Sequence, residues 1–374
     1  MKRLFLSFLF IAIAVISFSQ NIRMYAETGG QGIKFGVLSF DNDFRKFKLL
    51  DTRELNIGLS DGIGVDGNVA KKDIDRAIPL IYDSYKELLD LYSTQGLKDE
   101  GCYFYCSSGI GVAKNITDYK TQLSTKVNHG VYVVGEDEEA KYTIAGTVPF
   151  DKIDVALVFD QGGSNSKGGY VVKEEYTVAG KKKIRLRAIP VKYDLGSKRV
   201  EVLVRKYMTS VPEDKDAELV EYTKATNKVF DSLRQDINRS FSNIDGAELR
   251  NELYLSGGAA FCITTLINPE YDMKSQLVPV KFSELKAFLL DVQDKEAFAK
   301  IKARKFADEN VQKNYLKALK VYNQFQLVSA TKLLITFVNA LGGGEKELYF
   351  NRYGLHSMPS ILIGRVERGE IKNW

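Results

Sequence analysis

Near its middle the chain reads Asp160-Gln161-Gly162-Gly163-Ser164-Asn165-Ser166, directly after an apolar run at 154–160. An apolar run that ends in a carboxylate and a glycine-rich turn predicts a strand, a tight turn over Gln161–Gly169 and a returning strand at Tyr170–Tyr176. The opening of the chain has the same plan: Tyr25-Ala26-Glu27-Thr28-Gly29-Gly30-Gln31-Gly32-Ile33-Lys34-Phe35-Gly36-Val37-Leu38. The sequence therefore predicts two α/β halves, each led by a hairpin.

The segments between and after the hairpins complete this prediction. We expect a helix at Lys71–Tyr92 interrupted by Pro79, and a strand–helix–strand order that gives a parallel sheet with a right-handed crossover. In the second half, Arg199–Tyr207 is assigned to a strand. The remaining expected elements are strands at Cys102–Cys106, Gly130–Val134, Lys183–Tyr193, Glu252–Leu255 and Leu348–Phe350, and helices at Ser108–Thr125, Leu219–Asn238, Ser283–Val292, Lys295–Ala307, Val311–Ala318 and Gln326–Leu341.

The N-terminus has the pattern of a secretory signal. Lys2 and Arg3 precede an unbroken apolar or small run from Leu4 to Phe18, which is short for a membrane span. We expect a signal peptide at residues 1–20 and a periplasmic or secreted protein, with an uncleaved N-terminal anchor as the alternative. No other contact with a membrane is expected.

The bulk composition excludes few function classes. The formal charge of the 374-residue chain is +5, and loss of Lys2 and Arg3 leaves 5 − 2 = +3. Basic and aromatic residues do not interleave on one face, so nucleic acid is not an expected partner. The chain has 3 cysteines and 2 histidines, which favours small buried thiols over a zinc site. The sequence does not decide between a monomer and a homodimer.

Three glycine-rich turns follow expected strands: Glu27–Gly32, Asp160–Ser164 and Ser256–Ala259. Glycines in such turns let backbone N–H groups approach an anion, and a preceding carboxylate can hold a cation or order a water. Each turn alone is better explained as a simple turn, but two copies with an acidic residue at the same offset, Glu27 and Asp160, favour the functional interpretation. The acidic run Glu136–Glu139 opens a helix, where it either complements the helix dipole or supplies a general base.

The order of these motifs resembles the exopolyphosphatase/guanosine pentaphosphate phosphatase family of the actin-like ATPase superfamily. The segment 160–166 is similar to the family's Asp-x-Gly-Gly-Gly-Ser-Thr-Glu signature. Further matches lie at Gly58–Ala77, Ser107–Asn115, Gly135–Ala140, Leu195–Arg199, Ser256–Ala259 and Gly354-Leu355, so that the resemblance spans residues 24 to 362.

This resemblance implies two actin-like (ribonuclease-H-like) α/β lobes with a central cleft and a helical C-terminal part, at residues 21–150 and 151–374. It implies hydrolysis of terminal phosphoanhydrides of polyphosphate or another phosphorylated small ligand. Glu138 would be the catalytic carboxylate, and Glu27 and Asp160 would hold a divalent metal, Mg²⁺. The expected phosphate-binding residues are Gly29, Gly30, Gln31, Gly32, Ser108, Gly162, Gly163, Ser164, Asn165, Lys167, Gly257 and Gly258.

Several positions depart from the family pattern. Glu27 stands where the family has aspartate, Gly111 replaces an arginine that could grip phosphate, Ser164 replaces a glycine, and Lys167 replaces a glutamate. These replacements leave a second hypothesis open, a catalytically impaired protein of the same fold that binds phosphate or polyphosphate or serves as a scaffold. An ATP-driven kinase or filament protein is a third, less compatible with export.

Overall fold

A computed structural model describes residues 21–371, except residues 31, 60–62, 164, 179, 242–243, 245, 272–274 and 353. The expected signal peptide at residues 1–20 lies outside the described residues. The chain divides into two compact units: unit 1 runs to Glu139 and resumes at Pro359, and unit 2 comprises Ala140–Met358. Compared with the predicted lobes, residues 140–150 group with unit 2 and the C-terminal segment groups with unit 1.

Unit 1 is built on a five-stranded sheet with the order β3-β2-β1-β4-β5. β1 and β2 form the predicted antiparallel hairpin, and β4 pairs in parallel with both β1 and β5, which confirms the predicted parallel crossover. The elements of unit 1 are β1 (Asn21–Gly29), β2 (Gly32–Phe40), β3 (Phe47–Leu55), α2 (Ile63–Asp66), α3 (Lys71–Ser93), η1 (Asp99–Gly101), β4 (Cys102–Cys106), α4 (Ser108–Gly111), α5 (Ile116–Val127) and β5 (Val131–Val133).

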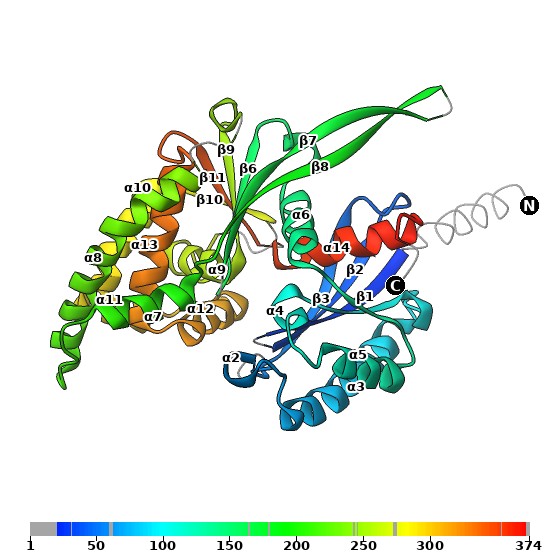
Figure 1. Cartoon of the computed structure of the whole chain (residues 1–374), viewed down its shortest axis with the longest axis horizontal. Helices are drawn as coiled ribbons and strands as arrows, with labels where there is room; N and C mark the ends of the chain where they lie inside the picture. The colour runs from blue at the N-terminus through cyan, green and yellow to red at the C-terminus, as the bar shows by residue number, and fades with distance from the viewer. Residues whose placement is uncertain are drawn as a thin grey trace, which may run out of the picture. The chain divides into compact units, whose positions relative to one another are not determined.

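Both faces of this sheet are covered by helices. Side chains alternate between the two faces along each strand, so each strand contributes to both contacts. Met24 and Phe104 point into a core shared with helices α3 and α5. Their neighbours Arg23 and Tyr103 point to the other face, where both contact Glu367 of α14 (Gly354–Glu367). Figure 1 shows α3 and α5 on one side of the strands and α14 on the other.

Unit 2 is built on a six-stranded sheet with the order β10-β11-β9-β6-β7-β8. Two helices, α6 (Glu136–Thr147) and α14, begin in one unit and end in the other. The other elements of unit 2 are η2 (Phe150–Lys152), β6 (Ala156–Gln161), β7 (Ser166–Val178), β8 (Lys181–Tyr193), α7 (Ser197–Tyr207), α8 (Lys215–Phe241), η3 (Ala247–Leu249), β9 (Glu252–Ser256), α9 (Gly257–Ile267), β10 (Leu277–Val280), α10 (Phe282–Gln293), α11 (Lys295–Ala303), α12 (Glu309–Val321), α13 (Gln324–Ala340) and β11 (Glu347–Asn351).

A large apolar core joins one face of this sheet to the helices. Phe159 of β6 and Leu255 of β9 pack there with Phe337 of α13. The opposite face carries Val158 and Tyr254, which pack with Ile144 of α6. The helical C-terminal part predicted from the sequence is therefore confirmed as the layer that covers one face of the second sheet.

Strands β7 and β8 continue as a two-stranded ribbon, which we call the arm (residues 166–193). β6 pairs with β7 only as far as Gly169, whereas β7 and β8 pair from Ser166–Tyr193 to Val178–Lys181. In Figure 1 the ribbon extends well past the other strands. The arm holds eight Lys or Arg and two Glu, a net charge of 8 − 2 = +6, so the rest of the chain carries 5 − 6 = −1.

Three expected elements are corrected by the structure, and in addition the single helix expected at Ser108–Thr125 is divided into α4 and α5. Residues 199–207 are helical, because Val200 and Val204 are fully buried at helical spacing while Val202 between them is 54% exposed. Helix α3 runs through Pro79 without interruption, since Pro79 lies on its exposed side. Strand β7 begins at Ser166, so the predicted turn over residues 161–169 is shorter and Gly168 and Gly169 lie within the strand.

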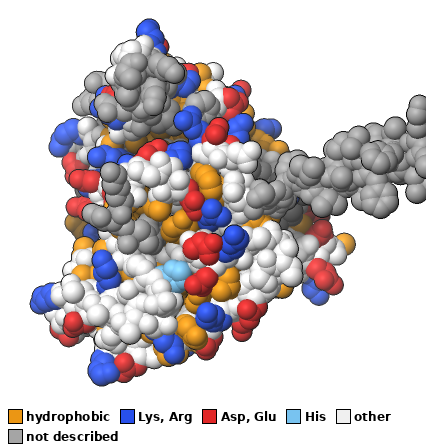
Figure 2. Space-filling model, turned by 90° about the vertical axis from the view of Figure 1, so that its right-hand side faces the viewer, with side chains coloured by type: hydrophobic (Ala, Val, Ile, Leu, Met, Phe, Trp, Pro, Cys, Tyr) orange, Lys and Arg blue, Asp and Glu red, His pale blue; other side chains and the backbone are white. Residues whose placement is uncertain are grey.

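Cys102, Cys106 and Cys262 are free and buried, as expected, and burial raises the pKa of each thiol to about 12. On the face drawn in Figure 2, acidic and basic side chains are intermixed. Among the described helices, none has the length and apolar character that a membrane crossing requires.

Candidate functional site

The first candidate carboxylate, Glu27, lies near the end of β1 and is only 8% exposed. Its Oε2 accepts a hydrogen bond of 2.9 Å from the Tyr105 hydroxyl of β4, and its Oε1 lies 3.7 Å from Nζ of Lys34. Burial, followed by the charge of Glu27, raises the pKa of Tyr105 well above its usual value. Tyr105 therefore stays protonated as a donor, and both carboxylate oxygens of Glu27 have protein partners.

The glycines of the first hairpin have structural roles of their own. A side chain at Gly32 would place its Cβ 2.5 Å from the carbonyl oxygen of Leu55 in β3. At Gly29 a Cβ would lie 3.3 Å from the carbonyl oxygen of Gly32, so the turn itself is tight there. Gly30 lies in the turn, and Gln31 lies outside the described residues. Close strand packing explains Gly32 without a ligand.

The acidic start of α6 provides two carboxylates with different environments. Glu139 Oε2 accepts a hydrogen bond of 2.8 Å from the backbone N–H of Ser108, the first residue of α4. The donor predicted to bind phosphate at Ser108 thus already has an acceptor. Glu138 Oε2 accepts a hydrogen bond of 2.9 Å from the Tyr132 hydroxyl, whose pKa is raised by burial and by that hydrogen bond. Glu138 is half-buried and held in one orientation.

In unit 2 the turn after β6 is tied to the start of α7. The backbone N–H of Gly162 donates to the carbonyl of Asn165 over 3.0 Å, which closes the turn. The carbonyls of Gly162 and Gly163 accept from the backbone N–H groups of Ser197 and Lys198, at 3.0 and 2.9 Å. These carbonyls cap the N-terminus of α7, which ties the described residues of the turn to that helix. Ser164 lies outside the described residues.

The end of β9 leads directly into the N-terminus of α9. Gly257 has φ +91°, and a Cβ there would overlap the backbone of Gln161, so only glycine fits. At Gly258, by contrast, a Cβ would meet nothing closer than the Tyr322 hydroxyl at 4.0 Å. Gly258 therefore faces open space beside the first N–H groups of an eleven-residue helix, the kind of position that binds anions.

Two buried polar atoms beside this helix start have no hydrogen-bond partner in the described part of the chain. They are the hydroxyl of Ser256 and Oε1 of Gln161, both on fully buried residues. Ser256 pairs in register with Asp160, so both residues lie at the C-terminal ends of the parallel strands β9 and β6. Unpaired buried acceptors and donors of this kind are costly unless water or a ligand satisfies them.

Tyr322 lies near the start of α9, because its hydroxyl is the atom closest to the Gly258 position. Its hydroxyl is 2.6 Å from Ser197 Oγ, and burial raises its pKa to about 12. Neither Tyr322 nor Ser256 was predicted as a site residue. Ser256 follows a strand and precedes two glycines, which is a usable signal, whereas nothing in the sequence around Tyr322 indicates its position.

Both hairpins place a lysine directly across from the candidate metal-binding carboxylate. Glu27 pairs in register with Lys34, and Asp160 pairs with Lys167. Cross-strand partners share one face of the sheet, with Cβ atoms about 4.5–5.5 Å apart. Lys167 is 5% exposed, so its charge is held within the protein. The two units thus repeat the same arrangement of carboxylate, glycine turn and lysine.

The described residues fit a divalent cation only in part. They contain no group of three or more Asp, Glu, His or Cys side chains that could hold a metal. Mg²⁺ needs only one or two carboxylates together with substrate phosphates and water. Asp160, which pairs in register with Ser256, and Glu27, which also contacts Lys34 and Tyr105, are the carboxylates that could offer such hard oxygen donors.

Comparison with known proteins supports the fold. No protein-family model matches the sequence, and no curated protein shows a significant sequence match. A Ppx/GppA family member from Aquifex aeolicus is similar in structure, with a TM-score of 0.64, 14% identity, and coverage of 94% of this chain and 99% of that chain. An exopolyphosphatase from Cytophaga hutchinsonii has a TM-score of 0.55 and 13% identity over 93% and 98% of the two chains.

An exopolyphosphatase-like protein is also similar, with a TM-score of 0.55 and 15% identity over 88% of this chain and 93% of that chain. The chain therefore has the fold of the Ppx/GppA exopolyphosphatases, a mixed α/β fold of the actin-like class. This confirms the fold class and the resemblance inferred from the motif order. The low identity shows a divergent member of the fold.

Proposed function

We propose that the protein is an exported phosphatase that hydrolyses terminal phosphoanhydride bonds of polyphosphate or a related phosphorylated ligand. The observation that carries the proposal is the group of residues at the C-terminal ends of β6 and β9, where α9 begins. The open Gly258 position lies at the start of that helix, the unpartnered Ser256 hydroxyl precedes it, and Ser256 pairs in register with Asp160, which in turn pairs with Lys167. Backbone N–H groups of a helix start and a buried lysine are both suited to phosphate oxygens.

In this proposal each residue has a defined task. The N–H groups of α9 and the ammonium group of Lys167 bind the phosphate, and Asp160 would hold Mg²⁺, which supplies charge neutralisation. Glu138, oriented by Tyr132 within unit 1, would be the general base that takes a proton from the attacking water. The bridging P–O bond breaks, and the bridging oxygen leaves with the shortened chain.

Phosphate release from long-chain polyphosphate tests this proposal, with and without Mg²⁺. Glu138→Gln keeps the hydrogen bond from Tyr132 but cannot take a proton, so we expect release to fall by about 100-fold or more. Glu139→Gln is the matched control, because its amide oxygen still accepts from Ser108. Equal release by the Glu138→Gln variant and the wild type, or no release by the wild type, would contradict the proposal; binding without release would identify a phosphate-binding protein instead.

Export is part of the same proposal and rests on the sequence of residues 1–20. We expect the mature chain to begin after Gln20 and to be recovered from the periplasmic or secreted fraction. N-terminal sequencing of the protein from each cell fraction measures this. A chain that keeps Met1 in the membrane fraction would show an uncleaved anchor.

A further inference from the structure

A cavity lies within the helical layer of unit 2, apart from the glycine turns. It has a volume of about 560 Å³ and is lined by one face each of α8, α10 and α13. The lining residues of α13 include Lys332, Thr336 and Asn339, spaced at i, i+4 and i+7 along one helical face. Cavities of this size hold small organic molecules.

Three cations enter the cavity, one from each helix: Arg234 from α8, Lys286 from α10 and Lys332 from α13. None of the described residues that line the cavity is a carboxylate. Within the part of the chain that the structure describes, the side chains of Arg234 and Lys332 make no hydrogen bond or ion pair, and Lys286 lies over the Phe282 ring at 4.3 Å. Burial and the nearby charge of Arg234 lower the pKa of Lys332, although Asp231 acts in the opposite direction.

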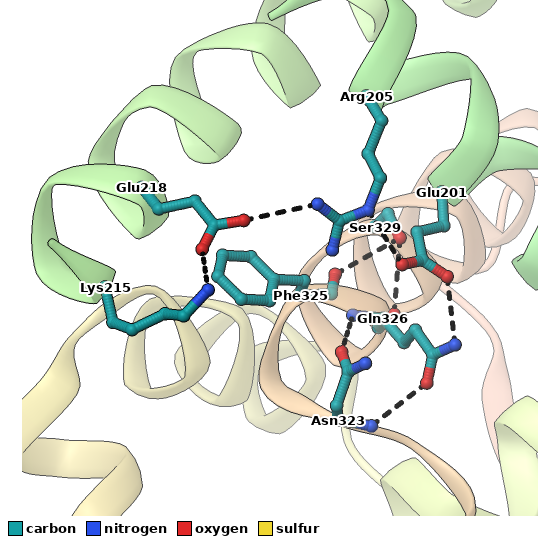
Figure 3. Close-up of polar contacts among 8 residues, drawn as sticks. All are labelled: Glu201, Arg205, Lys215, Glu218, Asn323, Phe325, Gln326 and Ser329. Carbon is teal, nitrogen blue, oxygen red and sulfur yellow. Dashed lines mark hydrogen bonds and ion pairs between the residues drawn. The ribbon is translucent and has the colours of Figure 1, made fainter. Parts of the chain in front are cut away.

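Other cations of the same helical layer are paired with carboxylates. Figure 3 shows Arg205 between Glu201 and Glu218, at 3.1 and 3.3 Å, and Lys215 at 2.6 Å from Glu218. The contrast matters because three like charges around one cavity repel one another unless an anion lies between them. An anion in the cavity would remove this repulsion and satisfy all three cations.

The remaining walls indicate more than a bare inorganic ion. Leu289 and Ile335 form an apolar wall, and Leu290 is 67% exposed at the rim. Asn339 offers an amide donor for the polar part of a ligand. We propose that this cavity binds an organic phosphate, with its phosphate groups on the three cations and its organic part against the leucine and isoleucine side chains.

Isothermal titration tests the proposal with ATP as the organic phosphate and tripolyphosphate as the inorganic probe with the same number of phosphates. The titrations use the Gly258→Asp background, in which a carboxylate blocks the proposed catalytic phosphate position. We expect ATP to bind, and Arg234→Gln or Lys332→Met to raise its Kd by about tenfold or more. Lys228→Gln, an exposed charge change on α8 outside the cavity, is the matched control and should leave Kd unchanged.

Equal ATP affinity in the cavity variants and the control would overturn the proposal, as would the absence of ATP binding. If tripolyphosphate binds as tightly as ATP, the proposal that the cavity recognises the organic part of the ligand is wrong. A second readout is the melting temperature without ligand. Lys332→Met should raise it by relieving repulsion with Arg234, and should abolish the rise that ATP produces in the wild type; a merely structural lysine would lower it.

Discussion

Gly258 is the glycine of the candidate site whose substitution the fold can accept. It is the second residue of α9, where an aspartate complements the helix dipole and its Cβ would meet no atom closer than 4.0 Å. The same carboxylate would repel a bound phosphate. We expect Gly258→Asp to keep the melting temperature of the wild type and to lower phosphate release by about 100-fold or more.

Gly258→Ala is the matched control, since its Cβ would contact only the Tyr322 hydroxyl at 4.0 Å. This variant should retain most of the phosphate release and the same melting temperature. Thermal denaturation and phosphate release, measured on both variants, separate a loss of anion binding from a loss of fold. Similar activity of the two variants would show that the start of α9 does not bind the substrate.

Individual site residues were predictable where a strand ended in a carboxylate. Asp160 lies where the sequence predicts, at the end of a strand and before a glycine turn. The lysine opposite each carboxylate was not predicted as a cross-strand partner, although the short turn fixes the register. Tyr132 and Tyr322 could not be predicted, because their contacts depend on how separate elements pack.

The contact between α7, α8 and α13 depends on an ionised carboxylate. Hydrogen bonding with Lys215 and Arg205 lowers the pKa of Glu218, whose side chain is 4% exposed. Its contribution to stability is present above the unfolded pKa of about 4.3 and is lost as the pH falls through the lower folded value. We therefore expect Glu218→Gln to destabilise unit 2 at pH 7 and to make its melting temperature less sensitive to acid.

Melting curves of the wild type and Glu218→Gln between pH 7 and pH 3 measure this effect. Glu213→Gln, a change at an exposed glutamate near the start of α8, is the control and should follow the wild type. The difference between wild type and Glu218→Gln should narrow at the lowest pH. A difference that stays constant over the whole range would assign the effect of the variant to packing and not to charge.

At the level of elements, strong local patterns were predictable and weak ones were not. Strand β4 has the predicted bounds, since five consecutive buried residues read as an internal parallel strand. Strand β3 was not predicted, because it lies at the sheet edge and most of its residues are partly exposed. Strand β10 was not predicted either, because it has only four residues and one of them is Pro279. The prediction of a strand at residues 199–207 was wrong. Valines favour strands, but the buried valines here follow the spacing of a helix.

In the whole chain, unit 1 is completed by the C-terminal residues. Leu362 and Ile363 of α14 are fully buried, and Glu367 contacts Arg23 and Tyr103 of the first sheet. Deletion of residues 359–374 should therefore unfold or strongly destabilise unit 1 while unit 2 keeps its structure. Two melting transitions in the wild type, of which the truncated chain retains one, would be the expected result; a truncated chain with unchanged transitions would contradict it.

The whole fold was predictable because the order of motifs along the chain is preserved even where single motifs are loose. The assignment of the C-terminal segment to unit 1 was not, since sequence order gives no sign that a chain returns to its first sheet. Burial of α14 against β1 and β4 is a long-range contact, which local patterns do not encode.

The arm has a further consequence for the behaviour of the protein in solution. Strand β8 is thirteen residues long and forms the outer edge of its sheet, so one side of its backbone has no partner among the described strands. Such an edge is a template for pairing with another chain and for aggregation, and lysines are the usual protection. The net charge of +6 on the arm makes two copies repel each other where their edges would meet. Because 1 M salt shortens the screening length to about 3 Å, concentrated salt should remove this protection and promote self-association through β8.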